Sequence, residues 1–510
     1  MGDHLARLVL LAIPLGGCSL LYDPDRLAPA AEGPPPPVKC ELLAIERVYP
    51  DELLEGQGAA GSRPAVLVIS GRDIAAGAMV SITPHDPADK PLLTVDMAKL
   101  SRDRFGTQLA VPIALDVDPN LGLTSSIRLD VTVTQPCPSS GGTATSTLQE
   151  LDGGAPALTL RGLAELTGAQ SVSTAAPNLY SRVDVTGLTA ADGAKPLIIR
   201  STSSITIGGT QSVSVSALDQ MPGPGGFAGG NGGDPNIIGS GGNGFMGGGP
   251  GGGIPNGGGA GFSAPGTGTS SGPGGPSAGD AALVTLDSPN RGSGGAGGKG
   301  AMLVQVVKGG AGGGGGGSIE LTAAGDLTVM VPIEAKGADG AKTNASSGGG
   351  GSGGVVLIRA GGRLTLASGP DAVTVAGGMP PVGAADAGAG APGRIRIDGL
   401  NRSIAVMANP MIGYRGPMFG AGTPTIVAEA RPRLAFIGQP SALVRYTIEG
   451  EDGTTRGPVE LSLSSTGETA VPLAVDLFAG YNKICALVTG VINRRDEAEN
   501  CITLAYVRPE

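Results

Sequence analysis

The chain has 510 residues, of which 92 are glycine and 41 are proline, and its formal net charge is −10. Apolar residues make up 40% and aromatic residues only 3%, which is too apolar for a wholly disordered chain and too rich in glycine for one ordinary globular domain. Glycine does not recur at every third position, which excludes a collagen triple helix, and no basic stretch offers a footprint for phosphates, which argues against a nucleic-acid partner.

The first residues predict an export signal and an anchor. Arg7 precedes an apolar stretch at 8–15 that is too short to span a bilayer, so residues 1–17 are interpreted as a signal peptide. The sequence at 15–18, LGGC, resembles the lipobox of bacterial lipoproteins. This resemblance implies that Cys18 becomes the acylated N-terminal residue and that lipid anchors the protein, while Ser19 resembles an outer-membrane sorting signal. An ordinary secretory signal with a coincidental cysteine is the alternative.

Residues 18–39 predict a tether, because Pro34 to Pro37 favour an extended polyproline II spacer. Four further cysteines fall two by two near the ends of the chain, as expected of disulfides formed in an oxidising compartment. The predicted pairs are Cys40 with Cys137 and Cys485 with Cys501. None of the spacings is CxxC, so no zinc site is predicted.

Residues 40–137 predict a small β-sandwich, because runs rich in β-branched residues alternate with Gly, Pro and Asp turns. The stretch 45–82 resembles the IPT/TIG immunoglobulin-like module, with Pro50 after the first strand, Gly71 closing the second and Gly77 leading into the third. This resemblance implies a spacer or a binding module.

One turn of this region carries the metal candidates. Asp116, Asp118 and Asn120 occupy alternate positions, as calcium ligands do, but the glycine comes one place late and Ile127 stands where a bidentate acid is needed. A plain turn is therefore favoured, and a calcium-stabilised adhesin is the weaker alternative. No other metal and no cofactor is predicted.

The central region, 146–410, contains a repeat of strands. Three segments, beginning at 197, 319 and 356, place apolar residues at the same four positions and a threonine at the same fifth one. The apolar quartets are Leu197, Ile199, Ile205 and Ile207; Ile319, Leu321, Leu327 and Val329; and Val356, Ile358, Leu364 and Leu366. A fourth, partial copy places Ile395, Ile397, Ile404 and Val406 in a similar pattern, with one extra residue in the middle.

Short strand pairs cannot bury an apolar face alone, so the repeat predicts a stacked, parallel β-helix-like solenoid. Glycine tracts are expected at its corners, and the insert at about 221–280 is expected to be an irregular loop because it has few bulky residues. The alternative is that the glycine chains pack closely against the solenoid. The phrases GGGGSIEL and GRIRI resemble the glycine-rich surface proteins of bacteria, especially myxobacterial lipoproteins.

Residues 421–510 predict a second sandwich, and the phrase at 478–488, FAGYNKICALV, resembles bacterial immunoglobulin-like domains. The predicted fold is therefore all-β: a glycine-rich solenoid flanked by two immunoglobulin-like sandwiches.

Catalysis is not predicted. The two histidines are His4 and His85, and the first leaves with the signal peptide, so neither a histidine-rich metal site nor a local serine triad can form. A β-helix polysaccharide lyase or hydrolase is the alternative, and its candidate charged residues look scattered along the chain. They are Arg200, Glu320, Asp326, Arg359, Arg363, Arg394, Arg396 and Asp398. The predicted function is structural or adhesive, at the outer membrane, with an envelope or extracellular polysaccharide or protein as partner.

Overall fold

The computed structural model describes residues 39–508, apart from gaps at 60–62, 91–92, 117–125, 138–139, 152, 175–177, 191–192, 235–243, 270–272, 280–285, 287–290, 300, 303–305, 368, 370, 400–412, 415, 421 and 489–499. The predicted signal peptide, Cys18 and nearly all of the predicted tether therefore lie outside the described residues. Within them the fold is all-β, as predicted: the described helices are two 3₁₀ turns, η2 (Cys40–Leu42) and η3 (Met97–Lys99). None of the described helices has the length and apolar character needed to cross a bilayer.

The first part is a pair of sheets around an apolar core, and all of their strand pairs are antiparallel except that of β2 with β10, which is parallel. One sheet contains β1 (Ala44–Tyr49), β3 (Ala65–Arg72), β7 (Gln108–Leu115), β5 (Leu93–Val95) and β6 (Ser101–Arg102). The other contains β2 (Glu52–Leu54), β10 (Leu158–Arg161), β8 (Ser126–Cys137), β4 (Met79–Pro84) and β9 (Gly142–Leu148). Alternate residues of β8 are buried, which is the period-two pattern of a strand with one face on the core.

This second sheet continues beyond the predicted boundary at residue 137. β9 pairs with β8 over its whole length, and β10 pairs with β8 on one side and β2 on the other. The strand at 158–161, expected within the central region, therefore belongs to the first sandwich. Its local pattern is that of any short strand, so the sequence did not distinguish the two sheets it could join.

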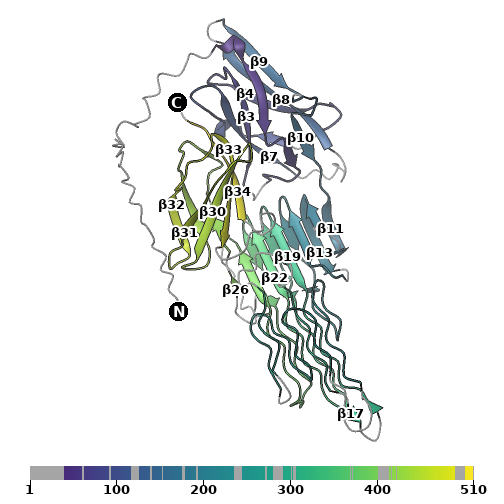
Figure 1. Ribbon diagram of the computed structural model, residues 1–510. Helices are drawn as coiled ribbons and strands as arrows, with labels where there is room; N and C mark the ends of the chain where they lie inside the picture. Colours follow the sequence, from purple (N-terminus) through teal and green to yellow (C-terminus); the bar gives the residue numbers. More distant parts are fainter. Residues whose placement is uncertain are drawn as a thin grey trace, which may run out of the picture. The chain divides into compact units, whose positions relative to one another are not determined.

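The centre consists of three parallel sheets that share one apolar core. The first contains β11 (Glu165–Val172), β13 (Arg182–Ala190), β15 (Ile205–Ile207), β20 (Leu327–Val329) and β23 (Leu364–Leu366). The second contains β12 (Asn178–Tyr180), β14 (Leu197–Ser201), β19 (Ser318–Ala323), β22 (Val355–Ala360), β25 (Arg394–Asp398) and β26 (Gly413–Tyr414). The third contains β16 (Val213–Ser214), β21 (Ile333–Glu334) and β24 (Val373–Thr374). Figure 1 shows β19 and β22 side by side, with extended chains running from this region toward β17.

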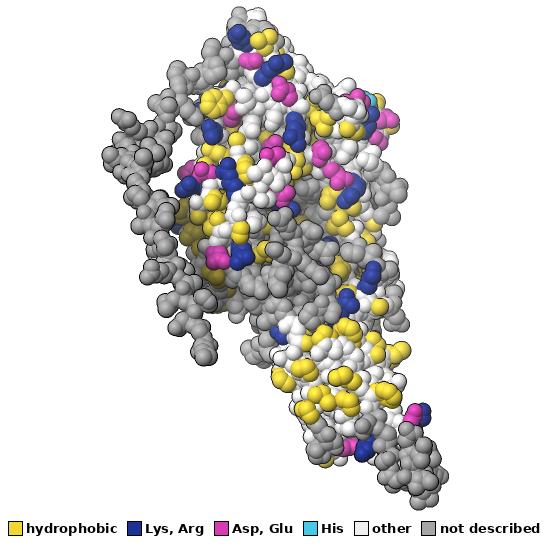
Figure 2. All heavy atoms as spheres, in the orientation of Figure 1, with side chains coloured by type: hydrophobic (Ala, Val, Ile, Leu, Met, Phe, Trp, Pro, Cys, Tyr) yellow, Lys and Arg dark blue, Asp and Glu magenta, His cyan; other side chains and the backbone are white. Residues whose placement is uncertain are grey.

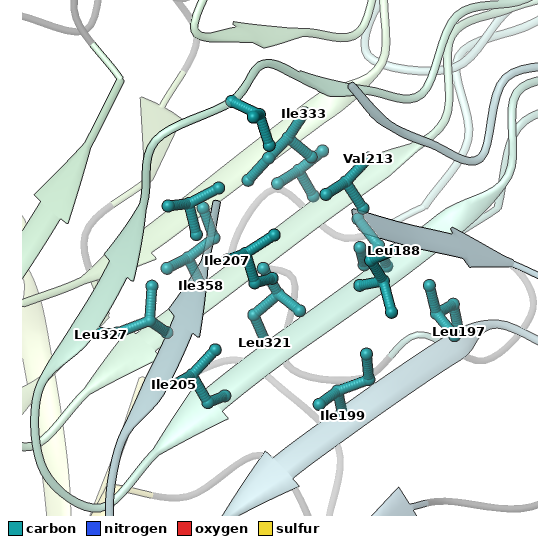
Figure 3. Packing of buried hydrophobic residues seen from close by; sticks show 14 of the residues in the cluster. Leu188, Leu197, Ile199, Ile205, Ile207, Val213, Leu321, Leu327, Ile333 and Ile358 are labelled. Atoms are coloured by element: carbon teal, nitrogen blue, oxygen red, sulfur yellow. The ribbon is translucent and has the colours of Figure 1, made fainter. Parts of the chain in front are cut away.

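The repeated apolar quartets lie in register across these sheets. Leu321 pairs with Ile199 on one side and with Ile358 on the other, and Leu327 pairs with Ile205 and Leu364 in the same way. The repeated threonines Thr206, Thr328 and Thr365 also pair with one another. The apolar side chains of the quartets, and not the threonines, point toward one another in a single buried cluster (Figure 3). The fourth copy continues the column through Ile395 and Ile397, whereas Ile404 and Val406 lie outside the described residues.

The glycine tracts form an ordered array of extended chains. The backbone N–H groups of Phe227, Gly230 and Gly233 donate to the carbonyl oxygens of Gly292, Gly295 and Gly298 at 3.0, 2.8 and 2.9 Å. This period of three residues is that of polyproline II geometry, in which hydrogen bonds must go to neighbouring chains. The expectation of an irregular loop at 221–280 was wrong for the described residues, and the close packing of glycine chains holds instead.

The hexaglycine at 312–317 lies inside this array. Its first three N–H groups, those of Gly312, Gly313 and Gly314, donate to three different segments of the chain, at Gly230, Gly349 and Asp219. The next three residues donate to the same three segments in the same order. A side chain would not fit there, because a Cβ added to Gly317 would lie 2.6 Å from the carbonyl oxygens of both Pro224 and Val215. Ordering therefore comes from backbone hydrogen bonds and close approach, for which bulky residues are not needed. At one end, β17 (Ala301–Met302) and β18 (Val306–Val307) form an antiparallel pair.

The last part is again a pair of sheets. A three-stranded sheet contains β27 (Met418–Phe419), β29 (Arg433–Ile437) and β32 (Glu468–Pro472). A five-stranded sheet contains β28 (Ile426–Val427), β34 (Asn500–Tyr506), β33 (Gly480–Val488), β30 (Leu443–Gly450) and β31 (Thr455–Ser462). Phe436, Tyr446 and Ile484 lie in the core between them.

Candidate functional site

Among the described residues lies a cavity of about 600 Å³. Its floor is the outer face of the second parallel sheet, and residues of both sandwiches complete its wall. The charged side chains that line it are Arg63, Arg200, Glu320, Arg359, Asp398 and Lys483. The cavity therefore brings together charged residues that are up to 420 positions apart (483 minus 63) in the sequence.

The strand register explains why charges gather on this face. The inward quartet residues of β14, β19, β22 and β25 alternate with outward residues, so pairing the quartets also pairs the outward positions. Arg200, Thr322, Arg359 and Asp398 form one such row across the sheet. Glu320 lies two residues before Thr322 on the same face, and its carboxylate accepts a hydrogen bond from Arg200 Nε at 2.9 Å.

Asp398 is the most heavily engaged group of this cluster. Its buried carboxylate lies 2.9 Å from Arg396 Nη2 and 3.5 Å from Arg359 Nε. It also accepts hydrogen bonds from the Gly416 backbone N–H at 2.7 Å and from Asn500 Nδ2 at 3.0 Å. Because Asn500 opens strand β34, this carboxylate ties the second parallel sheet directly to the last sandwich.

The pKa values in the cluster follow from burial and from these neighbours. Burial alone would raise the pKa of Asp398, but the guanidinium groups of Arg396 and Arg359 and the hydrogen bonds from Arg396 and Asn500 outweigh it and lower the pKa below its ordinary value. Burial, together with the like charge of Arg396, lowers the pKa of Arg359 to about 10. A glycosidase general acid needs a raised carboxyl pKa, so Asp398 is unsuited to that role.

Arg63 lies at the wall of the cavity and precedes strand β3. Its Nη2 donates to the carbonyl oxygens of Gly420 at 2.7 Å and Phe419 at 3.4 Å, which joins the two sandwiches. Its Nη1 is buried and has no hydrogen-bond partner among the described residues. Burial lowers the pKa of this guanidinium from its ordinary value.

Five of the eight charged residues predicted for a glycan enzyme come together here, so their description as scattered was wrong. They are Arg200, Glu320, Arg359, Arg396 and Asp398. The other three do not join them. Asp326 accepts a hydrogen bond from the Arg363 backbone N–H at 2.7 Å, and Arg394 lies over the Phe262 ring at 5.4 Å. Arg63 and Asn500 were missed, because no local pattern marks a residue that reaches the site from another sheet.

The cysteines and the metal candidates lie elsewhere. Cys40 and Cys137 form a disulfide with their Cα atoms 5.5 Å apart, and Cys485 and Cys501 form another with Cα atoms 4.1 Å apart, directly opposite each other in β33 and β34. Asp116 is exposed, whereas Asp118 and Asn120 fall outside the described residues. Within the described part of the chain, no group of three His, Cys, Asp or Glu side chains is placed to hold a metal ion.

A second candidate surface covers the glycine array. Its exposed large apolar side chains include Phe245, Met246, Met379 and Val382, the last of which is 94% exposed. Figure 2 shows apolar side chains spread over this part of the molecule, with few charged ones between them, whereas Lys, Arg, Asp and Glu are frequent over the sandwiches. Exposed apolar side chains that gather on one part of a protein with few charges between them are a feature of interaction sites.

No family model, no curated protein and no solved structure matches this chain.

Proposed function

We propose that the chain is a lipid-anchored, non-catalytic protein of the bacterial cell envelope that acts as a structural or adhesive scaffold. The observation that carries this proposal is the glycine array, an ordered assembly of backbone chains whose exposed surface is apolar and poor in charge. An exposed apolar surface of this kind is suited to adhesion to an envelope or extracellular polysaccharide or protein. The lipobox-like sequence at 15–18 supports the anchor at Cys18 and the outer membrane as its location.

In this proposal the three parallel sheets are the faces of a β-helix-like solenoid, and each repeated segment is one of its coils. Strands β14, β15 and β16 pair with β19, β20 and β21, and these pair in turn with β22, β23 and β24. Each segment thus adds one strand to each of three sheets, which is the pattern that stacked coils produce. The flanking sandwiches are proposed to be immunoglobulin-like spacers, the first of them similar to the IPT/TIG module.

The adhesive role is tested on the array surface. We expect the triple substitution Phe245→Ser, Met246→Ser and Val382→Ser to weaken adhesion, because these apolar side chains would no longer be buried against the partner. Retention of the purified protein on extracellular matrix from the producing cells should fall by at least about tenfold. The matched control is Met79→Ser, which removes a side chain that is 56% exposed on the first sandwich. Equal retention of both variants and the unchanged protein would reject the adhesive surface.

Anchoring and exposure are tested separately. Labelling with a radioactive fatty acid should modify the unchanged chain and spare Cys18→Ala, and protease added to intact cells should cleave a surface-exposed protein. A chain that incorporates no fatty acid is not a lipoprotein.

A glycan lyase or hydrolase is the second candidate, favoured by the gathering of four of the predicted charged residues in the lining of one cavity, with Arg396 paired to one of them, Asp398. It predicts that products are released from acidic polysaccharides and that Glu320→Gln abolishes the release. Absence of product with both the unchanged chain and the variant would remove this candidate.

A further inference from the structure

We infer that the cavity between the second parallel sheet and the two sandwiches binds a small acidic saccharide, whose carboxylate is held by Arg63. This goes beyond the structural or adhesive role, because it assigns a defined ligand site away from the glycine array.

The cavity is cationic in an acidic protein. Its lining contains four cationic side chains, Arg63, Arg200, Arg359 and Lys483, against the two carboxylates Glu320 and Asp398. Both carboxylates already have arginine partners, at 2.9 Å from Arg200 and 2.9 Å from Arg396. The chain as a whole carries a net charge of −10, so the side chains that line the cavity have the opposite sign of net charge, with Glu449 lying 4.0 Å from Lys483.

Arg63 is the cationic side chain of the lining that is best placed to bind an anion. Its Nη2 is satisfied by two carbonyl oxygens, whereas its buried Nη1 has no hydrogen-bond partner among the described residues. A buried guanidinium nitrogen without a hydrogen-bond acceptor is unfavourable, and a guanidinium matches a carboxylate in geometry as well as in charge. A carboxylate entering the cavity would supply the missing acceptor.

The size and lining of the cavity favour a sugar as the carrier of that carboxylate. A volume of about 600 Å³ is far more than one inorganic ion fills and lies in the range of small-molecule sites. Hydroxyl, amide and carboxylate groups of Thr322, Asn500, Thr503 and Glu320 line it, as hydrogen-bonding partners for sugar hydroxyls would, next to small apolar residues such as Ala323 and Ala360. An acidic disaccharide combines these requirements.

The test is titration calorimetry of the full chain in detergent with digalacturonate and with dimannuronate. We expect at least one of them to bind, its methyl diester to bind at least tenfold more weakly, and the affinity to fall as salt is added. Arg63→Gln should weaken binding at least tenfold, and Arg63→Lys, which keeps the charge, should restore part of it. The matched control Arg72→Gln removes the same charge from the same sandwich at a side chain that is 68% exposed, and should bind as the unchanged chain does.

Four outcomes would overturn the inference. They are absence of heat with both disaccharides, equal binding of the methyl diester, unchanged affinity in both Arg63 variants, and equal binding of inorganic sulfate or of tetraglutamate. The last would leave a general anion site or a peptide site in place of a saccharide site. Circular dichroism and melting of each variant establish that it is folded before it is titrated.

Discussion

The substitution Gly317→Ala tests the claim that close approach of backbones orders the glycine array. An added Cβ would lie 2.6 Å from the carbonyl oxygens of Pro224 and Val215, which belong to a different chain segment from Gly317. Ordinary van der Waals contact begins at 3.4 Å, so each oxygen would have to retreat by about 0.8 Å (3.4 minus 2.6). Neither can do so freely, because both are hydrogen-bond acceptors within the array.

The cost follows from these hydrogen bonds. Pro224 O accepts from the Ser318 N–H at 2.8 Å and Val215 O accepts from the Gly317 N–H at 2.7 Å. Weakening both costs about 2 kcal/mol at roughly 1 kcal/mol each, and overpacking of a tight interior adds to it. Replacing glycine stabilises by only about 0.4–1 kcal/mol through the unfolded chain, and only where the new residue fits. We expect the array to lose about 2 kcal/mol of local stability, which is roughly a thirtyfold change in its opening equilibrium.

Hydrogen exchange followed by mass spectrometry measures that opening. Amides of 312–317 and of their hydrogen-bonded neighbours should exchange about thirtyfold faster in Gly317→Ala, because local opening controls their protection. The matched control is Gly187→Ala in β13, where an added Cβ would meet nothing within 4 Å. Equal protection of the array in Gly317→Ala and Gly187→Ala would refute the reasoning, since the one variant has the clash and the other has none.

Three further predictions concern the stability of the other parts. Leu321→Ala should destabilise the parallel sheets by about 2–5 kcal/mol in thermal melting because it opens a cavity between Ile199 and Ile358, whereas Met330→Ala, at a position that is 59% exposed, should change little. Replacing Cys485 and Cys501 by serine removes a link across 16 residues and should destabilise the last sandwich by about 3 kcal/mol in urea, and an unchanged midpoint would contradict it. Asp398→Asn leaves buried arginines without their counter-charge and should cost about 3–5 kcal/mol, against almost nothing for the exposed Asp476→Asn.

The pKa of Asp398 also fixes the sign of one pH dependence. Because its folded pKa lies below the ordinary value of 3.8, its stabilising contribution is complete above about pH 4 and is lost as the pH falls through the folded pKa. Melting temperatures measured between about pH 2 and pH 6 should therefore fall more steeply at the acid end in the unchanged chain than in Asp398→Asn. Parallel curves would show that this carboxylate does not couple protonation to folding.

The strands of the centre could be predicted because their signal is local and repeated. An inward residue at every second position, copied three times with the same spacing, permits only one alignment, and Ile199, Leu321 and Ile358 do pair as that alignment requires. The same alignment contained the charged row, since Arg200 and Arg359 each follow an aligned quartet residue by one position. Extending the alignment to these outward positions is enough to place the two arginines on one face of the sheet from the amino-acid sequence alone.

The glycine array and the remainder of the cavity could not be predicted in this way. A glycine tract has no side chains whose pattern could specify a neighbour, and the partners of Gly312 to Gly314 lie in three separate segments. Arg63 and Asn500 reach the cavity from sandwiches at opposite ends of the chain. Their placement therefore depends on how the sandwiches pack against the parallel sheets, and no residue spacing within a single sandwich encodes it. Contacts of this kind have no signature in a single sequence.

The three-residue hydrogen-bonding cycle has a consequence for how such chains change length. Inserting one triplet moves every donor of a segment onto the next equivalent acceptor, so the lattice is preserved, whereas one or two extra residues turn donors toward the wrong neighbours. At about 3.1 Å per residue, a triplet lengthens a chain by about 9 Å. Related proteins could thus adjust how far the array reaches from its sheets in whole steps, through duplication of nine nucleotides, while the aliphatic column at its base stays untouched.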